Sequence, residues 1–268
     1  DAAQTFALNT NTVNLGGNIV NYGTFNGSPS AATTSAWTLA FNGSGSQTVF
    51  NQNAPGLRIF NVRLEKPSGY VELASTGNSN LIVRNSLEFS SINNAYIIAD
   101  NPSTRFVSID PDPWSTPQIL RVGKGHVSGM LYHWIGAGAQ NVTFTVGADS
   151  IDSYRPVVFE SGDNDNTPGL VGVRAYNVEH PDFPSSQVRP ETNIGRYWYI
   201  KTNGFALGSG KSYDLTTFWV TPGDTIGLGN PNTFLYEHFE RNPGYADNVT
   251  GTWTNRLTVL KGNNFVKS

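Results

Sequence analysis

The histidines are the side chains in this sequence best suited to acid–base or metal chemistry, because imidazole changes its charge near neutral pH and ligates metals. There are four of them: His126, His133, His180 and His238. His126 and His133 stand seven residues apart, and no Asp or Glu lies between Asp112 and Asp149 to complete a ligand set nearby. A catalytic or metal site would need partners brought in by folding. The sequence therefore favours histidines on turns or on strand surfaces.

A second chemistry open to this sequence is glycoside hydrolysis, which needs two carboxyl groups facing one cleft. Glu65, Glu72 and Glu88 fall on separate expected strands and could align across a sheet. Acidic side chains on the exposed face of a half-buried sheet are nevertheless the ordinary arrangement. We expect no catalytic residues, and the sequence also lacks nucleophile-elbow, zinc-protease and phosphate-loop motifs.

Residues 163–166, Asp-Asn-Asp-Asn, place oxygen ligands close together, and Asp163 and Asp165 could bind calcium. The segment lacks the glycine and the distal glutamate of an EF-hand loop, which favours a plain turn. Asp110 and Asp112 form a weaker candidate of the same kind. We expect no cofactor, with calcium as the open alternative.

Exposed aromatic rings can stack on sugars, and Trp114 is the main candidate because it lies in a proline-rich loop. Tyr132 and Trp134 flank His133 and should point to the opposite face of their strand. Tyr197 and Tyr199 should likewise share one face. At least one face of each strand must belong to the core, so most of these rings are expected to be structural.

The N-terminal stretch of residues 5–15 is extended in character and carries no charge. Its apolar side chains, Phe6, Leu8, Val13 and Leu15, could complete a sheet. Within one chain this stretch would be the first strand, whereas between chains it would be a donated strand that joins copies. The run at residues 257–260 could provide the matching edge.

Composition restricts the fold more firmly than it restricts the function. The chain has 268 residues, of which 38% are hydrophobic and 12% aromatic, enough for a core, while only 14% are charged. A net charge of −3 gives no electrostatic basis for binding nucleic acid. No apolar run is long enough for a membrane helix. Cysteine is absent and Met130 is the single methionine, which suits an extracellular protein.

The order of expected elements predicts an all-β protein. Residues 5–110 contain short alternating segments separated by Asn/Gly/Ser turns, typical of a short β-solenoid or a sandwich. A proline- and aspartate-rich connection follows at residues 100–118, and longer strands after it predict an antiparallel β-sandwich. We therefore expect a solenoid-like region at 1–115 and a sandwich domain at 116–268.

Several segments resemble secreted cell-surface proteins of Bacteroidota, which join a glycine-turned β-solenoid to a following module. The motifs are Val127-Ser128-Gly129, Phe144-Thr145-Val146-Gly147, Tyr154-Arg155-Pro156-Val157 and Arg196-Tyr197-Trp198-Tyr199-Ile200. Thr145 departs from the family pattern, which has proline there. The resemblance implies a non-catalytic, surface-exposed protein, exported by a route like type IX secretion, and it names no ligand.

Two further segments resemble the Asp-Ser/Thr-aliphatic acceptor of Bacteroidota O-glycosylation. They are residues 149–151 and 224–226, and they would place glycans on Ser150 and Thr225.

Taken together, these observations predict a non-enzymatic extracellular structural or adhesive protein. It would assemble with copies of itself into a filament or surface layer, or bind a receptor or glycan on a cell surface. The alternative is a carbohydrate-binding module with Trp114 in its site, and a third reading is a polysaccharide-degrading enzyme built on a solenoid.

Overall fold

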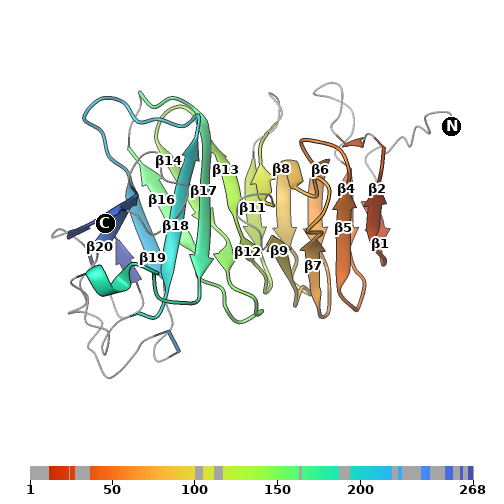
Figure 1. Ribbon diagram of the computed structural model, residues 1–268. Helices are drawn as coiled ribbons and strands as arrows, with labels where there is room; N and C mark the ends of the chain where they lie inside the picture. Colours follow the sequence, from red (N-terminus) through yellow and green to blue (C-terminus); the bar gives the residue numbers. More distant parts are fainter. Residues whose placement is uncertain are drawn as a thin grey trace.

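The computed structural model describes residues 12–23, 25–27, 37–99, 105–111, 117–162, 165–186, 194–218, 223–224, 237–241, 251–255, 260–261 and 265–267. The all-β prediction is confirmed, and so is the solenoid in the N-terminal half (Figure 1). The described residues contain one short helical element, the 3-10 turn η1 (Phe183–Ser185).

Sheet A runs the length of the molecule. Its strands, in spatial order, are β1 (Thr12–Leu15), β4 (Thr38–Phe41), β6 (Leu57–Leu64), β8 (Leu81–Phe89), β10 (Val107–Ile109), β13 (Leu131–Ile135), β17 (Gly169–Tyr176) and β18 (Tyr197–Asn203). Two short strands, β3 (Asn26–Gly27) and β11 (Gln118–Arg121), pair with β6 and β8 respectively. Pairing is parallel from β1 to β13 and antiparallel from β13 to β18.

Sheet B forms the opposite wall of the solenoid and is parallel throughout. Its strands are β2 (Ile19–Asn21), β5 (Gln47–Asn51), β7 (Tyr70–Leu73), β9 (Tyr96–Ala99), β12 (Val127–Gly129) and β15 (Val146–Gly147). The chain alternates between sheets A and B, so each coil adds a strand to both. Parallel neighbours require such a crossover.

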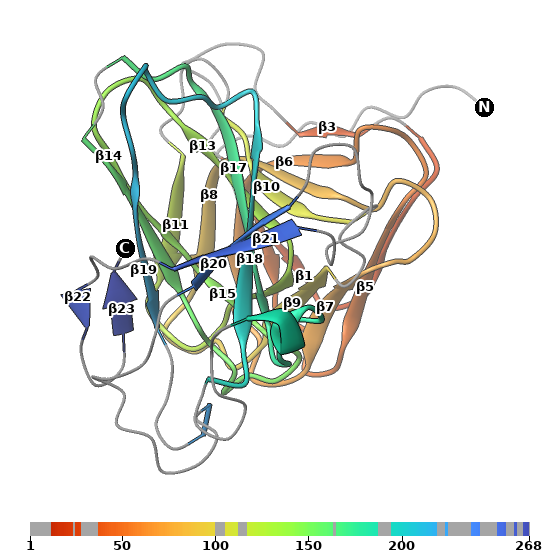
Figure 2. The same cartoon turned by 60° about the vertical axis from the view of Figure 1, so that its left-hand side comes forward.

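The antiparallel part lies at the C-terminal end of the solenoid (Figure 2). Sheet C contains β14 (Gln140–Phe144), β16 (Val157–Ser161), β19 (Asp214–Phe218), β23 (Phe265–Lys267) and β22 (Leu260–Lys261), and a separate hairpin joins β20 (Glu237–Arg241) to β21 (Gly251–Asn255). One hydrophobic core continues from the solenoid into this part. Parallel pairing extends to β13 and β15, so the pairing changes after the expected division at residues 115 and 116.

Stacked aliphatic side chains fill the space between the sheets. One inward row consists of Leu57, Leu81, Val107, Leu131 and Val173, which occupy successive register positions and are at most 1% exposed. Burying such a side chain contributes about 1.5–3 kcal/mol. Because every coil repeats the row, each coil completes the burial of the one before it.

Coils approach closely where glycine replaces a side chain. Gly129 has a φ of +121°, and a Cβ there would lie 1.8 Å from the carbonyl oxygen of Ala99 on the neighbouring coil. Only glycine accepts both the left-handed backbone and that approach. The glycine in the Val-Ser-Gly motif therefore has a structural reason.

Buried polar side chains link successive coils at the corners. Lys66 is fully buried, and its ammonium donates to the carbonyl oxygens of Gly43 (2.7 Å) and Gly45 (2.6 Å) and to Gln47 Oε1 (2.8 Å). Gln47 in turn donates to the carbonyl of Leu15 at 2.9 Å. These three acceptors match the three donors of the ammonium group, which is why a lysine can stay inside without a carboxylate partner.

Asn51 occupies the opposite corner and is 1% exposed. Its amide donates to the carbonyl of Asn78 at 3.1 Å, and its Oδ1 accepts from Asn21 Nδ2 at 2.6 Å, so one side chain joins three coils. We expect Asn51→Ala to lower the free energy of unfolding by about 2 kcal/mol, because buried polar partners lose their bonds. Urea unfolding measures the change. Gln52→Ala, at the exposed neighbouring position, serves as the control and should change stability by less than about 0.5 kcal/mol.

Candidate interaction surfaces

The N-terminal end of the solenoid is open within the described part of the chain. β1 pairs only with β4, β2 only with β5, and β3 only with β6, so three strands present an unpaired edge. Val13 and Leu15 point toward the core and are half-buried, as expected for a first strand. On the outside of β2, Val20 is 62% exposed and Tyr22, just beyond the strand, is 72% exposed.

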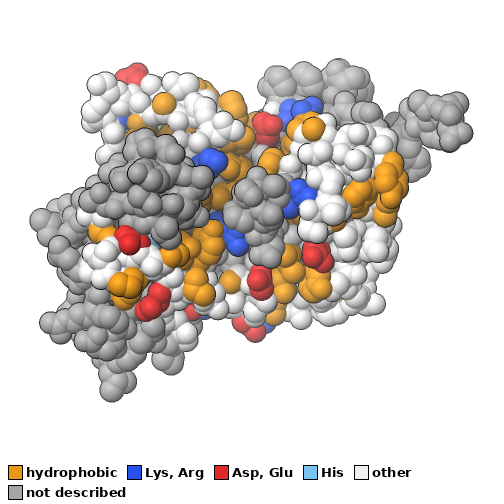
Figure 3. Space-filling model, in the orientation of Figure 1, with side chains coloured by type: hydrophobic (Ala, Val, Ile, Leu, Met, Phe, Trp, Pro, Cys, Tyr) orange, Lys and Arg blue, Asp and Glu red, His pale blue; other side chains and the backbone are white. Residues whose placement is uncertain are grey.

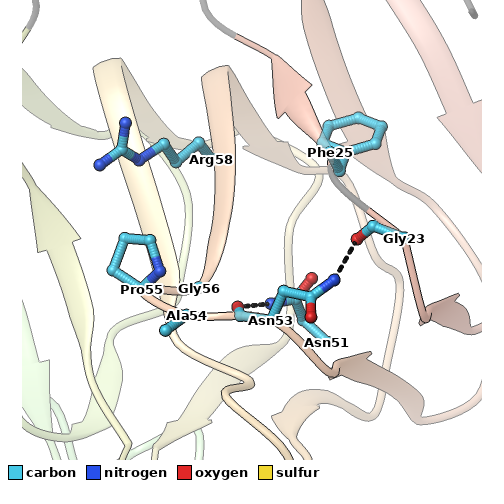
Figure 4. A pocket seen from close by; sticks show the side chains of 8 residues that line it. All are labelled: Gly23, Phe25, Asn51, Asn53, Ala54, Pro55, Gly56 and Arg58. Carbon is cyan, nitrogen blue, oxygen red and sulfur yellow. Dashed lines mark hydrogen bonds between the residues drawn. The ribbon is translucent and has the colours of Figure 1, made fainter.

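A pocket of about 230 Å³ lies beside this end, lined by residues of the first coils, among them Phe25, Asn53 and Pro55 (Figure 4). Its amide groups are occupied by the fold, since Asn53 Nδ2 donates to the carbonyls of Tyr22 (3.2 Å) and Gly23 (2.9 Å). The pocket therefore lies at a coil-to-coil turn in which the Asn53 amide nitrogen is already bonded to main-chain carbonyls, and Arg58 also lines it.

A second surface is the outer face of β13, β17 and β18. The alternation along these strands turns Tyr132, Trp134 and Tyr199 outward, while His133 and Trp198 face the core. The expectation that Tyr132 and Trp134 share the face opposite His133 is confirmed. Further along the same face, the rings of Tyr176 and Tyr197 stack with centroids 4.4 Å apart.

The phenols of Tyr132 and Tyr197 remain neutral at physiological pH, because both pKa values are raised. Burial raises the pKa of Tyr197 to about 12, and the neighbouring Tyr176 adds to the shift. Burial also raises the pKa of Tyr132, with a smaller contribution from Tyr199. Positive charge comes from Arg174, whose guanidinium lies 4.5 Å from the Tyr176 ring centroid, and from the exposed Lys201. The surface is thus aromatic and cationic.

The expectation that the histidines lie on turns or strand surfaces is wrong for three of them: His126 is 0%, His133 5% and His180 9% exposed. Burial lowers the pKa of both His126 and His133 to about 4. His126 Nε2 donates to the carbonyl of Ala148 at 2.7 Å, and the ring stacks on Tyr96. These imidazoles are neutral parts of the core. The side chain of His238 lies outside the described residues.

The glutamates considered for glycoside hydrolysis do not all lie on one sheet. Glu72 lies on sheet B between Thr48 and Ile98, whereas Glu88 lies on sheet A beside Arg63. Glu65 forms an ion pair with Arg63 at 2.7 Å.

Of the two residues of the predicted calcium site, Asp163 lies outside the described residues, and Asp165 is described and exposed. Of the weaker pair, Asp110 forms an ion pair with Arg84 at 3.0 Å and Asp112 lies outside the described residues. Among the residues that the structure describes, no group of three His, Asp or Glu side chains could hold a metal ion. Nor does any helix in that part have the length and apolar character needed to span a membrane.

The proposed glycosylation sites differ in context. Ser150 is exposed in a turn, where its backbone nitrogen donates to the carbonyl of Ala148 at 2.8 Å. Asp224 of the second motif is buried and holds the guanidinium groups of Arg155 and Arg196, so this aspartate has a structural role. Five predicted site residues lie outside the described residues: Phe6, Leu8, Trp114, Asp163 and Thr225.

Comparisons of the chain with models of protein families, with curated proteins and with solved structures found no match.

Proposed function

We propose that this chain is a non-enzymatic structural or adhesive protein, secreted or displayed at a cell surface, whose copies join through the open N-terminal end of the solenoid. The join would be β-strand addition, in which main-chain groups of one copy complete the sheet of another. The surface-protein resemblance of the sequence motifs supports the extracellular setting.

The observation that carries the proposal is the absence of charge at this end. After Asp1, the next charged side chain in the sequence is Arg58, so all the residues of the first two coils are uncharged. Natural proteins usually protect exposed strand edges with lysine, other charges or proline. Here the strands β1, β2 and β3 carry none of these residues, and Val20 and Tyr22 expose apolar surface next to them.

The occupant that we propose for this edge is the N-terminal segment of a second copy, with Phe6 and Leu8 as its apolar side chains. The opposite end of sheet A is different, since its edge strand β18 carries Lys201. Sheet C ends at β22, which begins with Leu260 of the C-terminal run considered as a matching edge. The uncharged end is therefore the receiving end, and the direction of assembly is set by this asymmetry.

Electron microscopy of the concentrated protein tests the proposal. We expect ordered assemblies for the full chain and dispersed particles for a variant that lacks residues 1–11. Val20→Lys should also disperse the assemblies, because it places a charge on the edge strand. The matched control is Val122→Lys, at a valine that is 68% exposed but lies beyond β11. Dispersed particles of the full chain, or assemblies that survive Val20→Lys and the truncation, would overturn the proposal in favour of a monomeric adhesin or glycan-binding module.

A further inference from the structure

We infer that the outer face of β13, β17 and β18 binds an acidic saccharide, with Tyr132, Trp134 and Tyr199 as ring-stacking surfaces and Lys201 as the partner of a carboxylate. This site lies at the opposite end of the molecule from the open solenoid edge, and the inference does not depend on assembly (Figure 1).

The first argument is the way in which Tyr132 lies on the sheet. Tyr132, Gly172 and Lys201 occupy one register row across the three strands. A Cβ at Gly172 would lie 2.5 Å from Tyr132 Cε1 and 2.7 Å from Cδ1, so the ring extends over the glycine. The edge-on ring of Phe106, 5.4 Å away, holds Tyr132 from the other side. The result is a half-buried ring fixed against a rigid sheet.

The neighbouring rows extend this platform. Trp134 lies two residues further along β13, and Tyr199 lies two residues before Lys201 on β18, so both flank the Tyr132 row on the same face. Figure 3 shows hydrophobic side chains in several patches on the side of the molecule seen in Figure 1, with Lys and Arg as well as Asp and Glu side chains beside them. Rigid aromatic rings provide contact area at a low cost in conformational entropy.

Charge complementarity selects an anionic ligand. The strands β10, β13, β17 and β18 contain no Asp or Glu, whereas they contribute Arg174 and Lys201. The side chain of Lys201 is exposed, and its ammonium group makes no ion pair or hydrogen bond with the described residues. Asp110, the acidic residue nearest to this face in register, is already paired with Arg84. A charge-assisted bond to a ligand carboxylate would use Lys201 at no cost to the fold.

The far end of the face is closed by the C-terminal hairpin. Trp253 on β21 packs edge-on against His180, with ring centroids 5.1 Å apart, and Trp253 Nε1 donates to the carbonyl of Asp182 at 3.1 Å. His180 in turn contacts Tyr197. The open part of the platform is therefore the end that holds Tyr132, Trp134 and Lys201.

Isothermal titration calorimetry with polygalacturonate fragments tests the site, and fully methyl-esterified fragments provide the uncharged ligand with the same rings. We expect binding of polygalacturonate, a loss of affinity of at least about tenfold on esterification, and a similar loss for Lys201→Glu. Trp134→Ala should also weaken binding while the circular dichroism spectrum stays unchanged. Lys211→Glu, an equal charge change at an exposed loop residue, is the matched control and should alter affinity by less than about twofold.

Several outcomes would overturn the inference. One is the absence of binding at millimolar uronic acid, and another is equal binding of the esterified fragments. A third is a loss of affinity for Lys211→Glu equal to that for Lys201→Glu, which would mean that net charge, and not the position of Lys201, determines binding. If Trp114→Ala abolished binding while Lys201→Glu and Trp134→Ala left it intact, the saccharide site would belong to the proline-rich loop.

Discussion

Acidification from pH 7 to pH 4 is expected to lower the free energy of unfolding by about 6 kcal/mol through two histidines alone. His126 and His133 are buried with a pKa of about 4, whereas an unfolded histidine titrates near 6.5. Between these values the unfolded chain binds protons that the folded chain does not, so stability increases with pH. Each histidine contributes about 3 kcal/mol, which is fully present above pH 6.5 and is lost as the pH falls toward 4.

Burial is the main cause of both shifts, and the charges around His126 modify it. Arg121 and Arg155 lower the pKa of His126 further, while the hydrogen bond to Ala148 and the charge of Asp149 oppose them. His133 has one opposing influence, its bond to the carbonyl of Trp134 at 2.7 Å. Protonation of either ring would place a positive charge in the core, where unpaired charge is costly.

Urea unfolding midpoints measured at pH 7.5, 6.5, 5.5 and 4.5 test this prediction. The wild-type midpoint should be constant above pH 6.5 and should decrease below it. The free energy of unfolding derived from it should fall with pH at a slope that corresponds to the uptake of nearly two protons on unfolding. His126→Gln and His133→Gln should each reduce the slope by about one proton, whatever they do to stability at pH 7.5. A midpoint that stays constant down to pH 4.5 would contradict the prediction, because it would mean that the histidines have the same pKa in the folded and unfolded states.

Much of the strand pattern was predictable from the sequence. Period-2 alternation marks β1, β5 and β7, because each of these strands buries alternate side chains. The turns between the strands contain Asn and Gly, which favour tight reversals. The all-β class therefore follows from residue types and local spacing, whereas the spacing alone left a short solenoid and a sandwich both open for residues 5–110.

The coil length was not predictable, because it varies with the size of the turns. Leu57 pairs with Leu81, 24 residues further on, and Leu81 pairs with Val107 after 26. Ser86, however, pairs with Gln118 after 32 residues, since the proline-rich connection is inserted there. A parallel ladder requires matched strands and tolerates unequal loops, so the sequence shows no fixed repeat.

The face that each strand buries was also hard to predict where both faces are partly apolar. In β13, Leu131, His133 and Ile135 alternate with Tyr132 and Trp134. Leu131 and Ile135 are buried in the core, and His133 lies on the same face of the strand and is buried with them. Tyr132 and Trp134 therefore lie on the outer face. Hydrophobicity alone would place Tyr132 and Trp134 inside, which is why the aromatic platform was missed. The sequence signal for this platform is that β13 begins and ends with an aliphatic residue, Leu131 and Ile135, on the face opposite the aromatic rings.

The second large effect is expected at Asp224, the carboxylate that joins two arginines inside the molecule. Arg155 precedes β16 of sheet C, and Arg196 precedes β18 of sheet A. Arg155 Nη2 donates to Asp224 Oδ1 at 2.8 Å, Arg155 Nε donates to Oδ2, and Arg196 Nη2 donates to Oδ1 at 2.9 Å. The three side chains are 8%, 2% and 3% exposed for Arg155, Arg196 and Asp224. One residue thus connects the two sheets of the antiparallel part.

We expect Asp224→Asn to lower the free energy of unfolding by about 3–5 kcal/mol, because two buried guanidinium groups lose their counter-charge while the volume stays the same. The control is Asp152→Asn, which breaks the ion pair with Lys124, a pair with both side chains more than half exposed, and should cost less than about 1 kcal/mol. Urea unfolding at pH 7.5 measures both. Equal losses would mean that water reaches the arginines when the carboxylate is removed.

The same cluster joins one charged residue from each of three short segments noted in the sequence. Arg155 belongs to the Tyr-Arg-Pro-Val segment, Arg196 begins the Arg-Tyr-Trp-Tyr-Ile segment, and Asp224 begins the Asp-Thr-Ile segment. All three charged residues meet at one buried point. Arg155→Met and Arg196→Met should therefore each destabilise the protein less than Asp224→Asn, because each leaves the aspartate one arginine partner. A cost for either arginine variant that exceeds that of Asp224→Asn would contradict a network centred on the carboxylate.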